Sequence, residues 1–197
     1  MIVCSRIQSS ETEKKSIRQH KAAYDLLHRT LKQFYHLTDE ECEIEKKDNG
    51  KPYLCNREDL HISISHCEDM VAVSVGAFVQ GVDIERVRPY KDNILKRVLS
   101  EKELDYFIKM GKNPYDFFRF WTLKESFVKT TGEGLRRPLT EIEFQLEEEK
   151  VLSNQENFHF YSCCILQNFV LAYCEDGPMT ETPILYEYEN HNFIKMV

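Results

Sequence analysis

The chain has 197 residues, of which 42% are hydrophobic, enough for one domain or for two small half-domains packed together. Its formal net charge of −7 argues against non-specific binding along a nucleic-acid backbone, which requires a basic surface. The longest nearly apolar run, MVAVSVGAFV, is about half as long as a membrane-spanning helix, and the N-terminus turns polar too early for a secretory signal. The seven cysteines show no C-x-x-C pair and no zinc spacing. We therefore expect a cytoplasmic protein with no nucleic-acid or membrane partner.

The first part of the chain predicts a strand, a helix and a hairpin. The strand is IVCSRI. The helix is expected over residues 10–35, where apolar residues recur at helical spacing: Ala23, Leu27, Leu31 and Phe34. After a turn at DNGKP, the segment LHISISHCEDMVAVSVG predicts two alternating strands joined by a longer polar loop, SHCED. The strand GVDIE follows directly.

The second part of the chain repeats this order. Residues 92–110 have a helical pattern, and a longer helix is expected over residues 114–131, closed by Gly132 and Gly134. The segments EIEFQL, NFHFYSCCIL, NFVLAYCE and ILYEYE predict strands. Because a helical region followed by two linked strands occurs twice, we expect two similar α+β halves, residues 1–78 and 79–197, with a ligand site between them.

Two carboxylates stand out in GVDIE. Successive side chains of a strand point to opposite faces, so Asp83 and Glu85 share one face while Val82 and Ile84 share the other. Two like charges this close indicate either a well-solvated edge strand or a positive group between them. The fragment alone leaves both interpretations open.

A third carboxylate lies on the long helix, in FWTLKESFVKTTGEGL. Glu125 and Lys129 have the spacing of an ordinary surface ion pair. However, Glu125 lies one turn from Trp121 on a largely apolar helix, and a buried carboxylate needs a strong partner. Together with Asp83 and Glu85 it would suit Mg²⁺, which prefers oxygen ligands and often bridges to phosphate.

Several polar residues near these carboxylates would serve as phosphate ligands if they face the same site. Ser65 and His66 lie in the expected hairpin loop, and Lys51 lies in the turn GKP; each is by default an ordinary loop residue. The sequence contains neither a Walker loop nor a Rossmann turn, so any phosphates are held by other means.

The ordered combination of GKP, ISISH, GVDIE and WTLKESFVKTTGEGL resembles the Sfp-type 4'-phosphopantetheinyl transferases. The resemblance spans most of residues 14–146. It implies an α+β pseudo-dimer of two similar half-domains with the active site between them. It also implies transfer of phosphopantetheine from coenzyme A to a serine of an apo acyl or peptidyl carrier protein, which leaves adenosine 3',5'-bisphosphate.

The resemblance also implies a role for individual residues. It makes Asp83, Glu85 and Glu125 the Mg²⁺ ligands and assigns Lys129 to the phosphates. It implies contacts with coenzyme A for Lys14, Thr30, Lys51, Pro52, Ser65 and His66. A second basic position one turn after Lys14 is occupied by Ile17, so Arg18 is the expected substitute at the 3'-phosphate.

The expected chemistry needs a base for the serine proton and stabilisation of the leaving group. Glu125 is the candidate base, acting either directly or through a metal-bound water, and Lys129 supports the developing charge. The resemblance implies an acidic carrier partner, and the basic residues after GVDIE would form its landing surface: Arg86, Arg88, Lys91, Lys96 and Arg97. Two halves in one chain favour a monomer.

Two other functions would use the same residues. A magnesium-dependent hydrolase of coenzyme A or another nucleotide pyrophosphate would activate water in place of a serine. A non-catalytic carrier-protein-binding or nucleotide-binding module would use its acidic residues only structurally.

Overall fold

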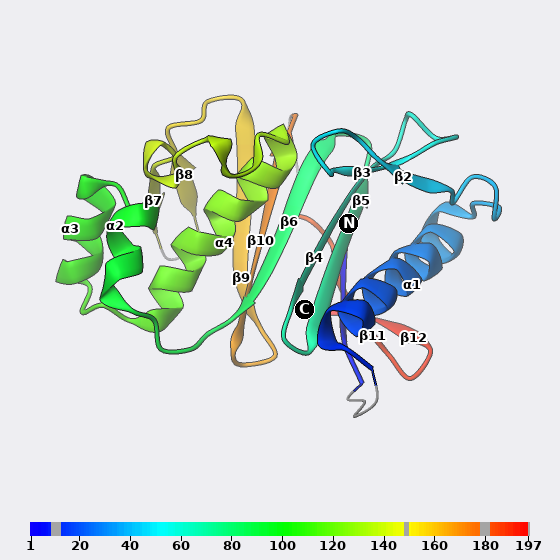
Figure 1. Cartoon of the computed structure of the whole chain (residues 1–197), viewed down its shortest axis with the longest axis horizontal. Coiled ribbons are helices and arrows are strands. Elements are labelled where there is room, and N and C mark those ends of the chain that lie inside the picture. Colours follow the sequence, from blue (N-terminus) through cyan, green and yellow to red (C-terminus); the bar gives the residue numbers. More distant parts are fainter. Residues whose placement is uncertain (9–12, 148–149, 178–181, 197) are drawn as a thin grey trace.

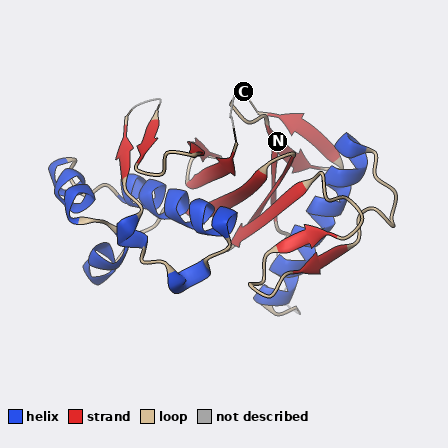
Figure 2. Ribbon diagram, turned by 90° about the horizontal axis from the view of Figure 1, so that it is seen from above, coloured by secondary structure: helices blue, strands red, loops and turns tan. Residues whose placement is uncertain are grey.

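The computed structural model describes residues 1–8, 13–147, 150–177 and 182–196. Helices and strands are mixed along the chain, which confirms the α+β class. Figure 1 shows strands β6, β4 and β5 side by side in the middle of the molecule, with the long helices α4 and α1 on either side of them. Figure 2 shows the same arrangement from above. In the part of the chain that is described, no helix combines the length and apolar character needed to cross a membrane.

The first half is a three-stranded antiparallel unit covered by one helix. β5 lies between β1 and β4, and α1 packs against all three strands. The packing face of α1 is the apolar stripe of residues 23–31, in which Ala23, Leu27 and Leu31 are buried. The elements are β1 (Ile2–Arg6), α1 (Lys15–Tyr35), β2 (Ile44–Lys46), β3 (Pro52–Leu54), β4 (His61–Cys67) and β5 (Met70–Gly76).

The second half has the same order of pairing. β10 lies between β6 and β9, again antiparallel, and α4 packs against β6 and β10. Its elements are β6 (Val79–Arg86), the 3-10 turn η1 (Asp92–Ile94), α2 (Leu95–Val98), α3 (Glu101–Lys109), α4 (Pro114–Thr131), η2 (Gly134–Arg136), η3 (Leu139–Glu141), β7 (Phe144–Leu146), β8 (Val151–Ser153), β9 (Phe158–Ile165) and β10 (Phe169–Asp176).

Each half therefore runs strand, long helix, small two-stranded ribbon and hairpin, with the hairpin's second strand in the centre of its sheet. This repetition is compatible with a pseudo-dimer. The C-terminal hairpin departs from the expected division at residue 78. β11 (Leu185–Glu189) pairs in parallel with β1, and β12 (Asn192–Lys195) pairs with β11, so residues 185–195 extend the sheet of the first half.

Strand β6 joins the two halves. The backbone N–H of Val82 donates to the hydroxyl of Ser63 at 3.0 Å, and that of Ile84 donates to the hydroxyl of Ser65 at 3.3 Å. The alternating serines of ISISH thus satisfy backbone donors that no neighbouring strand satisfies. Val82 and Ile84 point into a core shared by both sheets, where they are fully buried.

Three expected elements differ in extent from the structure. The first helix begins at Lys15, and expected residues 10–12 lie outside the described residues. The expected helix over residues 92–110 is divided into η1, α2 and α3. Leu99 is extended and ends α2, and Ser100 caps α3. The expected polar loop SHCED is a tight turn: β4 continues through Cys67, β5 starts at Met70, and Glu68 adopts a positive φ of 39°.

Candidate active site

The site begins on β6, whose alternation turns Asp83 and Glu85 away from the shared core. Helix α4 crosses this face unusually closely. A Cβ atom at Gly81 would collide with the carbonyl oxygen of Ser126, so only glycine permits this approach. The bare Cα of Gly81 therefore brings the α4 backbone against the strand that carries both carboxylates.

Helix α4 starts and ends where the local sequence dictates. The side chain of Asn113 accepts a hydrogen bond from the N–H of Tyr115 at 3.0 Å, and Pro114 occupies the first turn. Gly132 ends the helix with a φ of 72°. Within these limits, Glu125 and Lys129 lie one turn apart and line the same cavity as Asp83.

Asp83 is the best-held side chain of the site. Its Oδ1 accepts hydrogen bonds from the Ser65 hydroxyl at 2.7 Å and from the Lys129 Nζ at 2.8 Å, and the same Nζ donates to the carbonyl of Val82 at 3.1 Å. Its Oδ2 is buried and has no hydrogen-bond partner among the described residues. Burial of a carboxylate oxygen without a donor costs free energy. A cation, or a hydrogen-bond donor from a ligand, would remove this cost.

The other two carboxylates are destabilised as anions. Burial raises the pKa of Glu85, although Arg88 Nη1 donates to its Oε2 at 2.7 Å. Burial likewise raises the pKa of Glu125, and the negative charge of Asp83 raises it further. Both shifts come first from burial and then from the negative charge of the neighbouring acids.

These residues surround a cavity of about 430 Å³ between the two halves. The first half contributes α1, the β2–β3 ribbon and β4, and the second half contributes β6 and α4. Its lining residues are His20, Ala23, Tyr24, Lys46, Gly50, Pro52, Ile64, Ser65, His66, Asp83, Glu85, Trp121, Glu125 and Lys129. The expected location between halves therefore holds a real cavity, in the size range of ligand sites.

His66 links this cavity to a second one. A neighbouring hollow of about 630 Å³ shares His66 and Glu85 with the first and extends past Lys15 and Arg88. Burial lowers the pKa of His66, and the positive charge of Lys129 lowers it further. The imidazole is thus favoured in its neutral form, able to donate one hydrogen bond and accept another. Ser65 and His66 belong to the end of strand β4 rather than to a loop, which gives them fixed positions.

The predicted metal ligands have donor atoms that suit Mg²⁺, but their side chains are not arranged around a common metal position. Among the described residues, no three His, Cys, Asp or Glu side chains stand ready to enclose a metal ion. Two of the three carboxylates are paired with basic side chains, Asp83 with Lys129 and Glu85 with Arg88. The unpartnered Oδ2 of Asp83 and the burial of all-oxygen donors nevertheless fit a hard divalent cation.

Three of the predicted coenzyme A contacts lie away from this cavity. Thr30 is fully buried, and its hydroxyl donates to the carbonyl of Leu26 in its own helix at 2.8 Å. Lys14 is the exposed residue that precedes α1. Arg18 lines a different cavity. Neither basic residue is among those that line the cavity between the halves.

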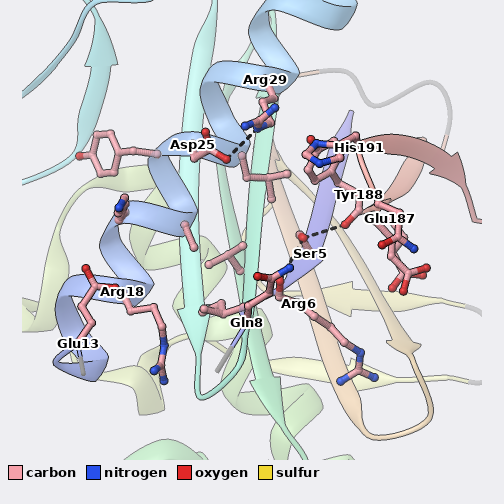
Figure 3. Close-up of a pocket in the computed structure, with 18 residues that line it drawn as sticks. Ser5, Arg6, Gln8, Glu13, Arg18, Asp25, Arg29, Glu187, Tyr188 and His191 are labelled. Carbon is pink, nitrogen blue, oxygen red and sulfur yellow. Dashed lines mark hydrogen bonds and ion pairs between the residues drawn. The ribbon is translucent and has the colours of Figure 1, made fainter. Parts of the chain in front are cut away.

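Arg18 faces a larger hollow, of about 970 Å³, between α1 and the β11–β12 turn (Figure 3). Figure 3 shows Arg29 paired with Asp25 and Ser5 with the backbone of Tyr188, so part of its polar lining is already engaged. We place the functional site in the smaller cavity, because that one gathers the three carboxylates, Lys129 and His66.

The side chain of Lys51 is engaged by backbone carbonyls of the second half. Its Nζ donates to the carbonyls of Thr130 at 2.7 Å and Gln80 at 3.2 Å, whereas its neighbours Gly50 and Pro52 line the cavity. Burial lowers the pKa of Lys51 to about 8, and the charge of Lys47 adds to this effect. The side chain therefore connects the two halves instead of pointing at the predicted nucleotide end.

Sequence reasoning overlooked residues on the first helix. His20 and Tyr24 line the cavity, one turn apart, with their rings stacked at a centroid distance of 4.4 Å. These two residues are four apart and lie beside the apolar stripe, a spacing from which their position on one face of the helix could have been predicted. Arg88, which holds Glu85, was assigned only to the partner surface.

The fold and the cavity define a class: a two-half α+β protein with an acidic, phosphate-compatible site between the halves. Residues 80–174 match the 4'-phosphopantetheinyl transferase superfamily. The 4'-phosphopantetheinyl transferase ffp of Bacillus subtilis is 29% identical over 175 residues, which cover 82% of this chain and 77% of that protein. The chain is thus similar to 4'-phosphopantetheinyl transferases over much of its length.

Other relatives are matched over smaller shares of their length. A second 4'-phosphopantetheinyl transferase of Bacillus subtilis is 34% identical over 52% of this chain and 47% of its own length. The transferase Sfp of Bacillus subtilis strain 168 is 28% identical over 65% of this chain and 58% of its own length. This chain thus spans about half of these two proteins. The holo-acyl-carrier-protein synthase of Thermotoga maritima superposes with a TM-score of 0.45 at 21% identity, over 57% of this chain and 71% of that one.

Proposed function

We propose that this protein transfers the 4'-phosphopantetheine group of coenzyme A to a serine of an apo acyl or peptidyl carrier protein and releases adenosine 3',5'-bisphosphate. The observation that carries the proposal is the cavity between the halves, where the unpartnered Oδ2 of Asp83 lies beside Glu85, Glu125 and Lys129. The match of residues 80–174 to the superfamily and the similarity to the transferase ffp support the same reaction.

We assign Asp83, Glu85 and Glu125 as the residues that hold Mg²⁺. Bound there with the pyrophosphate of coenzyme A, the ion would neutralise negative charge on the phosphate oxygens. Lys129 adds a positive charge at the same place, because its Nζ already reaches Asp83 at 2.8 Å. His66, at the end of β4, offers a hydrogen bond to phosphate oxygens from the first half, and its neighbour Ser65 lines the same cavity while its hydroxyl holds Asp83.

The residues of the chain suit the reaction in the following way. The oxygen of the carrier serine attacks the β-phosphorus of the coenzyme A diphosphate, and the bond from that phosphorus to the bridging oxygen breaks. Glu125, which lines the cavity beside Asp83 and Lys129, accepts the serine proton. Lys129 and His66 stabilise the charge on the departing bisphosphate. The product pair is a phosphopantetheinyl serine and adenosine 3',5'-bisphosphate.

For the carrier protein we propose a landing surface beside the site. Lys91, Lys96 and Arg97 are exposed on the segment that follows β6. Arg86 is less available than the sequence suggested, because it pairs with Glu68 and Asp69, and Arg88 pairs with Glu85. A cytoplasmic location and a monomeric state, expected from the cysteines and from the two halves in one chain, remain part of the proposal.

A hydrolase of coenzyme A would use the same carboxylates with water as the nucleophile. The two reactions are separated by incubating the protein with Mg²⁺ and coenzyme A, with and without an apo carrier protein, and measuring the released bisphosphate. Transfer predicts release that requires the carrier and matches its amount. Steady release without the carrier would make the protein a hydrolase. A non-catalytic module would release nothing in either case.

A further inference from the structure

The turn between β2 and β3 reaches across from the first half to the end of α4. The Asn49 Nδ2 donates to the carbonyl of Gly132 at 3.0 Å, and the Lys51 Nζ donates to the carbonyls of Thr130 at 2.7 Å and Gln80 at 3.2 Å. In Figure 1 this turn, in cyan, lies beside the last turn of α4. Three hydrogen bonds thus join the β2–β3 turn to α4 and β6.

These bonds satisfy groups that a helix cannot satisfy itself. The last four carbonyls of an α-helix have no intrahelical donor, and the negative end of the helix dipole favours a positive charge. Lys51 supplies both a donor and a charge at Thr130. A Cβ atom at Gly132 would collide with the Asn49 side chain, so the glycine that ends the helix also makes room for this contact.

The turn is itself held in shape. The N–H of Lys51 donates to the Asn49 Oδ1 at 3.1 Å, while Gly50 adopts a φ of 82° between them. One side chain therefore organises the turn and contacts the helix at once. The fixed turn presents Gly50 and Pro52 to the cavity, opposite Lys129, the residue directly before Thr130.

We propose that Asn49 and Lys51 form a latch that sets the distance between the two walls of the cavity. One wall is the β2–β3 turn, and the other is the last two turns of α4, which carry Glu125 and Lys129. Lys51 is then a positioning residue, which acts through α4, and not a phosphate ligand. This inference rests on the proposed function for its kinetic consequences, but its structural part does not.

The closeness of the latch to the reacting groups explains why a small displacement matters. Lys129 precedes Thr130 and must stay within reach of Asp83, whose Oδ1 it contacts at 2.8 Å. Without the latch, the close contact at Gly81 still holds the end of α4 on β6. The end of α4 can then shift relative to the β2–β3 turn. Misplacement of catalytic groups by about 1 Å can cost roughly 100-fold in rate.

The test compares Lys51→Met, Lys51→Arg and Asn49→Ala with the unaltered protein. Lys47→Met serves as the control, since it removes a lysine from the same turn without touching α4. Transfer to an apo carrier protein is measured with coenzyme A and with 3'-dephospho-coenzyme A. Fluorescence of Trp121, the only tryptophan in the sequence and a residue of the cavity wall, is recorded on each free protein.

The latch predicts that Lys51→Met and Asn49→Ala lower kcat on the order of tenfold or more with both substrates and shift the Trp121 emission. Lys51→Arg should recover part of the loss, and Lys47→Met should match the unaltered protein. A phosphate-ligand role would instead raise the KM for coenzyme A alone, with kcat and emission unchanged, and would overturn the latch. If the unaltered protein transfers nothing, the proposed function is wrong. If the Trp121 emission is unchanged in both Lys51→Met and Asn49→Ala, the latch is refuted, whatever the outcome for the function.

Discussion

The Nζ of Lys129 on α4 donates to the Oδ1 of Asp83 on β6 at 2.8 Å, which leaves the buried Oδ2 of Asp83 without a partner among the described residues. A helix and a strand that are distant in sequence thus hold one oxygen of the carboxylate and leave the other without a donor among the described residues. This geometry explains why one end of the carboxylate is satisfied by the protein and the other is available for a ligand.

The substitution Asp83→Asn tests this role with almost no change in shape. The amide loses the negative charge at the open position, so we expect transfer to fall by about 100- to 1,000-fold, the usual range for loss of a group that stabilises charge. The rate should be followed over a magnesium titration, with unfolding by urea as a check on the fold. If the Asp83→Asn variant keeps the magnesium dependence of the unaltered protein, Asp83 is excluded as a ligand.

Replacing Glu125 by Gln tests the proposed base. Loss of a general base typically lowers the rate by about 100- to 10,000-fold, so we expect a fall in kcat of that order at saturating coenzyme A and Mg²⁺. Binding of coenzyme A, measured by calorimetry, should weaken much less. Near-normal transfer rates at saturating Mg²⁺ would show that another group accepts the serine proton.

The buried pair of Lys124 and Glu103 should dominate the stability of the second half. Lys124 is fully buried and donates to Glu103 and to the carbonyls of Val98 and Leu139. Lys124→Met leaves the carboxylate of Glu103 buried without its charge partner, which should cost about 3–5 kcal/mol in the free energy of unfolding.

Urea denaturation measures this loss of stability, and two further variants serve as comparisons. The double variant Lys124→Met with Glu103→Leu should recover much of the loss, because no lone charge remains. Lys102→Met removes an exposed lysine that pairs with Glu143 at 3.4 Å and should change stability by less than about 1 kcal/mol. A loss for Lys124→Met as small as that of Lys102→Met would contradict the importance of the buried pair.

The proposed landing surface predicts a salt-dependent KM for the carrier protein. Lys96→Gln should raise that KM a few-fold at low salt and leave the KM for coenzyme A unchanged, because steering acts on the charged protein partner. Lys32→Gln on α1 is the matched control, since Lys32 pairs with Asp39 away from the site. A carrier KM that stays constant from low to high salt would mean that these basic residues are only a solvated surface.

Local patterns predicted the parts of the site that depend on one element at a time. The alternation in GVDIE placed Asp83 and Glu85 on one face of β6, and helical spacing placed Glu125 and Lys129 one turn apart. The same helical spacing places Thr30 on the buried stripe of α1 with Leu27 and Leu31. Its contact with coenzyme A therefore stays a prediction that rests on the resemblance alone.

Contacts between distant segments were not predictable in this way. The two hydrogen bonds from β6 to Ser63 and Ser65, and the reach of Lys51 to the end of α4, depend on how the halves meet. The C-terminal pairing of β11 with β1 likewise requires a long return of the chain. Strand patterns predict that such a segment pairs, but they do not specify its neighbour.

The central claim is the transfer itself, and intact-mass spectrometry tests it most directly. Several apo carrier proteins, of fatty-acid, polyketide and peptide type, are each incubated with this protein, coenzyme A and Mg²⁺. We predict that at least one gains the mass of a single phosphopantetheine, and that a variant of that carrier in which Ala replaces the acceptor serine gains none. Carriers that all keep their apo mass, while coenzyme A is left intact or cleaved to the bisphosphate, would contradict the proposed function.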